Sequence, residues 1–295
     1  YAFREYPIYT NKPGWSEHDP VLYWTIACDL IKECLKKSGV KGRDIKGIAN
    51  SSALPSMVMV DHNHHPINLA YNLMDRRATE EVKWLKEHIG EQRMFEINCN
   101  RIEDHSTLVN LMWEKKNRPD DFKRIHKALS IDGFIRLKLT GKATANYSSG
   151  AFFGVAYDVR KNKFDEELVE EIGLSMDIMP DFYSSEEIVG YVTEEAARET
   201  GLATGIPVAA GSVDCNAGWV GGGAVEVGDI QINLGTCGVM GCVHQNPDLM
   251  VDSMINCSYT TNSREVFVTV AATTTGGQSL RYLRDNFSQL EVATE

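Results

Sequence analysis

The sequence predicts an α/β protein, because helical and strand patterns alternate along its 295 residues. Helical apolar spacing follows the pair Asp19-Pro20, which is a favourable helix start. Short apolar runs at 57–60 and 207–211 are typical of buried strands. A hydrophobic share of 43% and a charged share of 24% are those of a globular protein, and the length is enough for about two domains.

In the first part of the chain, strands are expected on both sides of one helix. Residues 1–9 alternate loosely and predict a strand. The helix that begins at Pro20 is expected to end at Gly39, because glycine readily adopts the left-handed conformation of a helix C-cap. Two further strands are expected at 45–49 and 57–60, the second buried on both faces.

Helical patterns dominate the middle of the chain, and strands return toward its end. Helices are expected at 80–88, 107–116, 120–128, 132–139, 166–172 and 195–200. Strands are expected at 207–211, 230–234, 238–242 and 265–270, and a last helix at 279–286. The glycine-rich stretch 218–228 separates two sets of strands and is therefore the expected domain boundary.

The charge and the cysteine content indicate which binding partners and which cellular compartment are expected for this protein. A formal charge of −11 argues against nucleic-acid binding, which needs a basic surface for the phosphate backbone. Seven scattered cysteines without a C-x-x-C pair predict neither disulfides nor zinc, and reduced thiols indicate the cytoplasm. An apolar run of about 18 residues, as a membrane span would need, is absent from the sequence.

The densest chemical pattern runs from Gly211 to Gly238. Asp214 follows a buried strand, and ligands of α/β folds collect at the carboxyl ends of strands. A carboxylate there could accept the proton of a hydroxyl nucleophile. It could equally cap a helix that starts near Asn216, and the two roles are compatible.

Two glycine-containing turns could bind an anion. Gly235, Thr236 and Gly238 lie in a turn between two strands, where backbone N–H groups and a hydroxyl are available. Gly276-Gly277 precedes a helix, whose N-terminus favours phosphate. An ordinary hairpin turn and close helix packing are the alternatives. Neither a Walker A motif nor a G-x-G-x-x-G motif is present.

Six segments have to be considered together. They are Gly14-Trp15-Ser16-Glu17-His18-Asp19-Pro20, Asn72-Leu73-Met74-Asp75-Arg76-Arg77-Ala78, Leu139-Thr140-Gly141 with Tyr147-Ser148, Gly211-Ser212-Val213-Asp214, Leu234-Gly235-Thr236-Cys237-Gly238, and Gly276-Gly277 with Leu283-Arg284-Asp285. They are similar to G-W-x-E-Q-D-P, W-x-D-x-R, L-T-G…T-D-Y-S, A-G-x-x-D, L-G-T-S-G and G-G-x-x-L-R-W-x-R-D. In these motifs and in their order, the chain resembles the FGGY family of carbohydrate kinases across essentially its whole length.

The resemblance implies a fold, a reaction and two domains. The fold would be the actin-like ATPase (ribonuclease H-like) fold of two domains with an interdomain cleft, the second domain being incomplete. Residues 1–225 would form the N-terminal sugar-binding domain without its first strands, and 226–295 the start of the ATP-binding domain. The reaction would be ATP-dependent, Mg²⁺-assisted phosphorylation of a hydroxyl on a ketopentose, polyol or sugar acid.

The resemblance also implies residue roles. Asp214 would be the general base. The sugar would be held by Asn72, Asp75, Arg77 and Tyr147. The ATP phosphates would be lined by Gly235, Thr236, Gly277 and Arg281. No side chain is assigned as a metal ligand, and a homodimer is the assembly that family habit implies.

Departures from the family pattern bear on activity and substrate. The N-terminal D-x-G-T loop and the C-terminal adenine site are absent from this sequence, so the chain as written is expected to lack activity. Residues 52–56 stand where xylulose kinases carry G-Q-M-H-G, which argues against D-xylulose. Asn146 stands where the family often has Asp. The alternative function is a non-catalytic actin-like sugar-binding or regulatory protein, or an inactive remnant.

Overall fold

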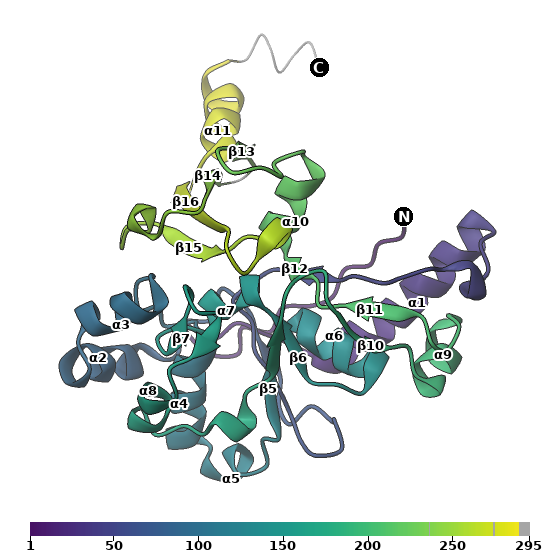
Figure 1. The fold of residues 1–295 in the computed structure, drawn as a ribbon, viewed down its shortest axis with the longest axis horizontal. Coiled ribbons are helices and arrows are strands. Elements are labelled where there is room, and N and C mark those ends of the chain that lie inside the picture. The colour runs from purple at the N-terminus through teal and green to yellow at the C-terminus, as the bar shows by residue number, and fades with distance from the viewer. Residues whose placement is uncertain (236, 274, 289–295) are drawn as a thin grey trace.

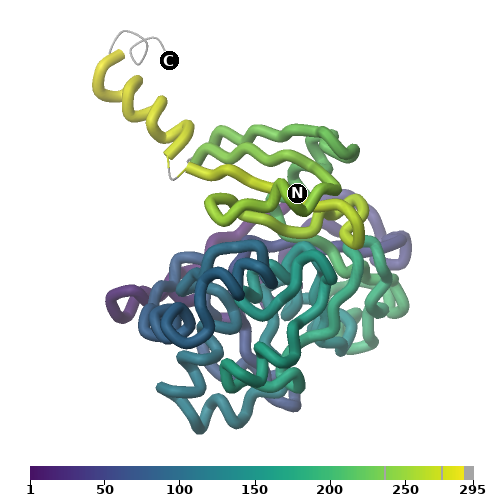
Figure 2. Tube along the Cα trace, turned by 60° about the vertical axis from the view of Figure 1, so that its left-hand side comes forward, coloured from purple at the N-terminus to yellow at the C-terminus, as the bar shows by residue number. Residues whose placement is uncertain are grey.

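The chain forms two lobes in a computed structural model that describes residues 1–235, 237–273 and 275–288. Figure 1 shows the larger lobe, which runs from the purple N-terminal segment through teal to the green segment of α9 and β11, below a smaller yellow-green lobe. Helix α10 (Asp214–Gly221) leads from one lobe to the other. Helix α11 (Gly277–Phe287) projects away from the body in both views (Figures 1 and 2).

Helices make up most of the larger lobe. The other α-helices are α1 (Pro20–Ser38), α2 (Thr79–His88), α3 (Glu91–Asn98), α4 (Thr107–Asn117), α5 (Pro119–Phe122), α6 (Ile131–Thr140), α7 (Tyr147–Phe153), α8 (Glu166–Glu171) and α9 (Glu194–Thr200). Short 3₁₀ turns are η1 (Gly42–Asp44), η2 (Met176–Ile178), η3 (Pro247–Leu249) and η4 (Thr260–Asn262).

The strands of the larger lobe are short and pair two by two. They are β1 (Glu17–His18), β2 (Ser51–Ser52), β3 (Val58–Val60), β4 (Ala70–Tyr71), β5 (Lys127–Leu129), β6 (Thr144–Asn146), β7 (Tyr157–Asp158), β8 (Lys163–Phe164), β9 (Asp181–Tyr183), β10 (Ile188–Tyr191), β11 (Pro207–Ala209) and β12 (Ser212–Val213). The pairs β2–β12 and β6–β9 are parallel. These parallel pairs matter for function because α7 and α10 begin directly after β6 and β12.

The smaller lobe is an antiparallel sheet. Its strands are β13 (Ile230–Leu234), β14 (Gly238–His244), β15 (Ile255–Ser258) and β16 (Phe267–Thr273), in the order β13-β14-β16-β15. Val268 and Trp219 belong to the same apolar cluster as Leu108 of α4, so one core continues across both lobes. A second core lies between α1, α6 and α9 and includes Trp24.

Several expected elements are confirmed. Helix α1 is capped by the Asp19 side chain, which accepts the N–H of Val21, and it ends at Gly39 with φ +71°. Strand β3 is buried throughout, as its apolar run predicted. Cys28, Cys99 and Cys257 are buried.

Three expected elements are wrong. Residues 1–9 form only a bridge from Tyr9 to Glu17, because most of this segment is exposed and alternation alone does not supply a partner strand. The segment 45–49 contributes only a bridge at Ile48. The helix expected at 120–128 ends at Phe122, since residues 127–129 instead pair with β3 as β5.

Candidate active site

Asp214 lies at the carboxyl end of β12, where the chain enters α10. It is the first residue of that helix, and its side chain is exposed. Strand β12 runs parallel to β2, with Val213 opposite Ser52. The preceding Gly211 has φ +74°, and a Cβ there would lie 2.0 Å from the Asn50 carbonyl oxygen. Glycine is therefore required for β12 to approach β2 this closely.

The surroundings of Asp214 favour a protonatable carboxyl group. Loss of hydration raises the pKa of Asp214 above its ordinary value, and the Asp132 carboxylate adds to the rise. The backbone N–H of Cys215, which donates to Asp214 Oδ1 at 2.7 Å, acts in the opposite direction. Part of the Asp214 side chain is open to solvent while the protein around the rest of it removes hydration, and such a carboxylate is suited to taking up a proton.

Asp214 is not the N-cap of α10, but it accepts one backbone N–H of the first helical turn. The N-cap residue is Val213, which has no side chain that could accept a hydrogen bond. Asp214 accepts one N–H of the first turn but remains exposed. The geometry is thus compatible with a contribution to the helix start and with a carboxylate offered to a ligand.

Tyr147 begins α7 directly after β6 and is half-buried. The hydroxyl of its neighbour Ser148 accepts the N–H of Val213 at 3.0 Å, so the starts of α7 and α10 are joined. Tyr147 also lies near the smaller lobe: the Arg264 guanidinium is 5.3 Å from the centre of its ring. Tyr147 and Asp214 therefore start two helices that are tied together at their first turns.

A buried polar network beneath these helices was missed from the sequence. Asp132 and Arg136 of α6 form an ion pair of 2.6 Å. Asp132 also accepts the hydroxyl of Ser52 at 3.0 Å and the amide of Asn146 at 3.1 Å. The available signal was an aspartate and an arginine four residues apart in an otherwise apolar helix pattern.

The predicted sugar loop is held by a second buried ion network. Arg77 donates to both Asp75 carboxylate oxygens, at 2.9 and 2.7 Å, and to Glu17 at 2.8 Å. Backbone N–H groups of Ser16 and Arg77 complete the partners of Asp75. The Arg77 guanidinium lies 3.8 Å from the centre of the Trp15 ring.

All three predicted sugar residues of this loop are buried. The side chains of Asp75 and Arg77 are 0% and 1% exposed, so both are enclosed by protein. Asn72 is also buried, and its side chain accepts the N–H of Met74 at 2.8 Å. Among the described residues, no hydrogen bond or ion pair joins this loop to Asp214. Contact of these three residues with a sugar stays a prediction.

The predicted phosphate elements lie together in the smaller lobe. Gly277 at the start of α11 donates its N–H to the Gly235 carbonyl at 2.8 Å. A Cβ at Gly276 would lie 2.4 Å from the nitrogen of Gly238, so the hairpin and the helix start touch through their backbones. Arg281 is exposed one turn further along α11. Thr236 lies outside the described residues.

A potential metal cluster lies elsewhere. Among the described residues, only Glu103, Asp104 and His105 bring three suitable ligand atoms within 4.8 Å of one another. Asp104 is also paired with Arg76 at 3.5 Å. The described residues around Gly235 and Gly277 are not part of this cluster.

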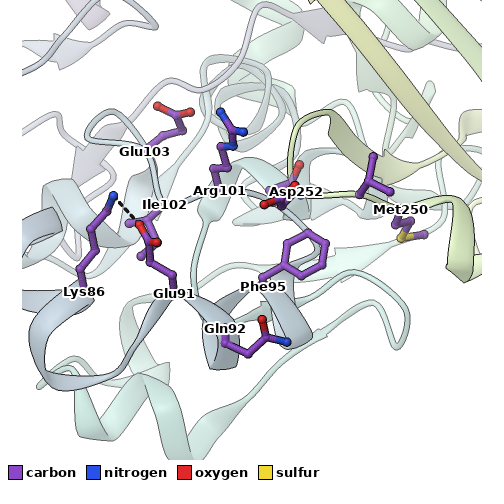
Figure 3. A pocket seen from close by; sticks show the side chains of 11 residues that line it. Lys86, Glu91, Gln92, Phe95, Arg101, Ile102, Glu103, Met250 and Asp252 are labelled. Carbon is purple, nitrogen blue, oxygen red and sulfur yellow. Dashed lines mark ion pairs between the residues drawn. The ribbon is translucent and has the colours of Figure 1, made fainter.

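A cavity of about 660 Å³ lies at the seam of the two lobes, away from Asp214. Figure 3 shows its lining, which combines residues near α2 and α3 with Met250 and Asp252 of the smaller lobe. Lys86 and Glu91 form an ion pair of 2.5 Å at its edge. Its lining includes none of the predicted site residues.

Within the described part of the chain, no helix combines the length and the apolar character that crossing a bilayer requires.

Among curated proteins, the chain is 26% identical over 288 residues to xylulose kinase of Bacillus subtilis (strain 168), covering 98% of this chain and 57% of that protein. It is 32% identical over 219 residues to a probable L-xylulose kinase of Haemophilus influenzae, covering 72% and 44%. The chain thus spans about half the length of the curated relatives it matches.

Solved structures share the fold. Xylulose kinase from Rhodospirillum rubrum superimposes with a TM-score of 0.87 at 22% identity, covering 95% of this chain and 57% of that one. Plasmodium falciparum glycerol kinase with ADP gives 0.85 at 18% identity, covering 96% and 58%. The actin-like fold of these sugar kinases is therefore present here. A profile of the FGGY family of carbohydrate kinases, N-terminal domain, matches residues 2–221, and the chain belongs to that family.

Proposed function

We propose that the protein carrying this chain is an ATP-dependent carbohydrate kinase in which Asp214 is the general base. The main support is the position of Asp214: an exposed carboxylate of raised pKa at the end of a parallel strand, where α10 leads into the other lobe. Ligands of α/β folds bind at such strand ends. Membership of a family of carbohydrate kinases supplies the reaction type.

The chemistry follows from these groups. A sugar hydroxyl oxygen forms a bond to the γ-phosphorus of ATP, and the bond from that phosphorus to the β,γ-bridging oxygen breaks, so that ADP leaves with the electron pair. The hydroxyl proton passes to the Asp214 carboxylate. Backbone N–H groups near Gly235 and Gly277, with the hydroxyl of Thr236 and the guanidinium of Arg281, would bind the phosphates. Mg²⁺, when bound, would neutralise phosphate charge.

The substrate class is a ketopentose, a polyol or a sugar acid. Tyr147 is the proposed sugar contact, because it begins the helix joined to α10. Asn72, which is buried like Asp75 and Arg77, stays a contact that only the resemblance implies. Asp75 and Arg77 are proposed to keep the sugar loop in shape, since their burial leaves them little access to a ligand. The departure at residues 52–56, of which Ser52 pairs with Val213 of β12, argues against D-xylulose. A cytoplasmic location and a homodimer remain predictions.

Substitution of Asp214 tests the function. In the complete gene product, ADP formation is measured with a panel of these sugars, and Asp214→Asn should lower kcat by about a hundredfold or more, because the amide has no basicity. The sugar dissociation constant should change little. Asp29→Asn, on the exposed side of α1, is the matched control. Near-normal turnover in Asp214→Asn would contradict the mechanism, and sugar binding without any ADP formation would favour the non-catalytic alternative.

A further inference from the structure

A chain of hydrogen bonds connects the buried ion pair of α6 with the backbone next to Asp214. The Asn146 amide nitrogen donates to Asp132 Oδ2 at 3.1 Å. The Ser148 hydroxyl donates to Asn146 Oδ1 at 2.6 Å. The Val213 N–H donates to the Ser148 hydroxyl at 3.0 Å. The three side chains are at most 2% exposed, so water does not compete for these bonds.

The Asp132 carboxylate, at the end of these hydrogen bonds farthest from Asp214, determines which group donates and which accepts in each of them. Asp132 is paired with Arg136 and only accepts hydrogen bonds, so the Asn146 side chain must turn its NH₂ group toward it. The Asn146 oxygen then faces Ser148, whose hydroxyl must donate to it. The lone pairs of that hydroxyl are left for the N–H of Val213. Each orientation is therefore fixed by the one before it.

The arrangement also ties three secondary-structure elements together. Arg136 donates to the Thr144 carbonyl at 2.9 Å, which holds α6 against β6. The Asn146 amide makes a further contact of 3.4 Å to the carbonyl of Ala210, just before β12. The hydroxyl of Ser212, which is 3.4 Å from that of Ser148, bonds to Thr260 of the smaller lobe.

We infer that Ser148 is a positioning residue for Asp214: its hydroxyl accepts the N–H of the Ser212–Val213 peptide and thereby anchors the backbone immediately before the residue that carries the Asp214 side chain. This inference rests on the proposed role of Asp214 as general base. Ser148 does not have to touch a substrate, since it acts through the backbone. Misplacing a catalytic group by about 1 Å can cost about a hundredfold in rate, so one such anchor is enough to matter.

Adjacent serines provide a matched pair of variants. Ser148→Ala removes the acceptor of the Val213 N–H. Ser149→Ala removes a hydroxyl that is equally buried but donates to the carbonyl of Asn146, the N-cap of α7, at 2.7 Å. In the complete gene product we expect Ser148→Ala to lower kcat about tenfold or more with little change in the KM for sugar. Ser149→Ala should leave kcat close to that of the parent.

A double-mutant cycle with Asp214→Asn separates positioning from general damage to the fold. If Ser148 acts through Asp214, Ser148→Ala should lower kcat in the parent but hardly at all when Asp214 is already Asn. Equal losses in both backgrounds, or an equal loss in Ser149→Ala, would overturn the inference. A parent without kinase activity, or an Asp214→Asn variant with normal turnover, would instead overturn the proposed function and the inference with it.

Amide hydrogen exchange gives a readout that does not need turnover. In Ser148→Ala the Val213 amide should exchange faster, and in Ser149→Ala it should not. Unchanged exchange in Ser148→Ala would count against the inference. If Ser148→Ala does not fold, Ser148→Cys keeps the size with a weaker acceptor, and the same two measurements apply to it.

Discussion

Arg77 is a buried cation that is paired with two buried carboxylates. It forms ion pairs with two carboxylates, Glu17 and Asp75, that are 4% and 0% exposed, and its guanidinium lies over the Trp15 ring. Removing one partner of a buried ion network leaves uncompensated charge, which is more costly than the loss of an exposed pair. The stability of the predicted sugar loop therefore depends on this one cation.

Arg77→Ala should lower the free energy of unfolding by about 3–5 kcal/mol, because Asp75 and Glu17 would stay buried without a cation. Arg77→Lys should recover only part of this loss, since lysine has neither the planar fork nor the stacking surface. Chemical denaturation of the chain measures both. The neighbouring Arg76 is exposed and serves as control, with an expected loss of about 1 kcal/mol or less in Arg76→Ala. Equal losses at both positions would contradict the assignment.

The raised pKa of Asp214 predicts how kcat depends on pH. Its pKa is raised, chiefly by loss of hydration, so the carboxylate becomes protonated at a higher pH than an ordinary aspartate, whose pKa is about 3.9. A base is inactive when protonated, so kcat should begin to fall at a pH above this value as the solution is acidified. The pH profile of kcat measures this limb. The limb should be missing from the residual activity of Asp214→Asn, and its persistence there would assign it to another group.

At the scale of elements, the β13–β14 hairpin contacts the start of α11 through backbone atoms, and a single substitution can test this contact. Gly276→Ala would place a Cβ 2.4 Å from the nitrogen of Gly238, and backbone atoms do not yield easily. The variant should weaken ATP binding more than sugar binding, because the predicted phosphate elements lie on both sides of this contact. Isothermal titration with ATP and with sugar measures the two separately.

The matched control for that substitution is Gly218→Ala. A Cβ at Gly218 meets no atom within 4 Å, and alanine favours the helix in which this residue lies. Its effect on ATP affinity should be small. Parallel losses for both ligands in Gly276→Ala would show that the change disturbs the fold rather than the phosphate elements.

Sequence patterns predicted the elements whose signals are local. Helix α1 was predicted by its caps, and the hairpin of β13 and β14 by apolar runs on both sides of a glycine turn. The helix expected at 120–128 failed because residues 127–129 pair with β3, and no local signal announces a partner so far away along the chain. Elements decided by tertiary pairing were thus the ones that pattern reasoning missed.

In the candidate site, too, the sequence predicted only the features that have a local signal. The order of motifs marked Asp214, Gly235 and Gly277 as candidates, and their roles stay predictions; the structure brings the two glycines into contact. The burial of Asp75 was not predictable from its motif, because it depends on how the surrounding chain packs around Arg77. The anchor at Ser148 was missed for the same reason: its partner Val213 is 65 residues away.

At the scale of the whole molecule, the smaller lobe presents a large apolar surface. Alternate residues of β13 are exposed on one face, and so is much of α11: Ile230 60%, Ile232 62%, Leu234 74%, Leu280 70%, Tyr282 61%, Leu283 52% and Phe287 71%. Exposed apolar surface on this scale is unusual for a monomer in water. It gives the lobe a tendency to associate.

The 295-residue chain on its own should therefore self-associate with rising concentration, and Ile232→Lys should reduce that association by placing a charge on the apolar face. Sedimentation velocity measures the distribution of species. Ile188→Lys is the control, because Ile188 is similarly exposed, at 50%, but lies on β10 of the larger lobe. A parent that stays monomeric over a wide concentration range would contradict this prediction, as would equal effects of the two variants.

The parallel pairing of β2 with β12 has a consequence for the time at which the protein can finish folding. The two strands are about 160 positions apart in the chain, so the partner of β2 leaves the ribosome long after β2 itself. At about 5–20 residues per second, the delay is roughly ten to thirty seconds. Pairing over such a separation is also entropically slow. The peptide that carries Asp214 is therefore among the last parts of the larger lobe to reach its place, and until then the edge of β2 depends on other parts of the chain, or on chaperones, for cover.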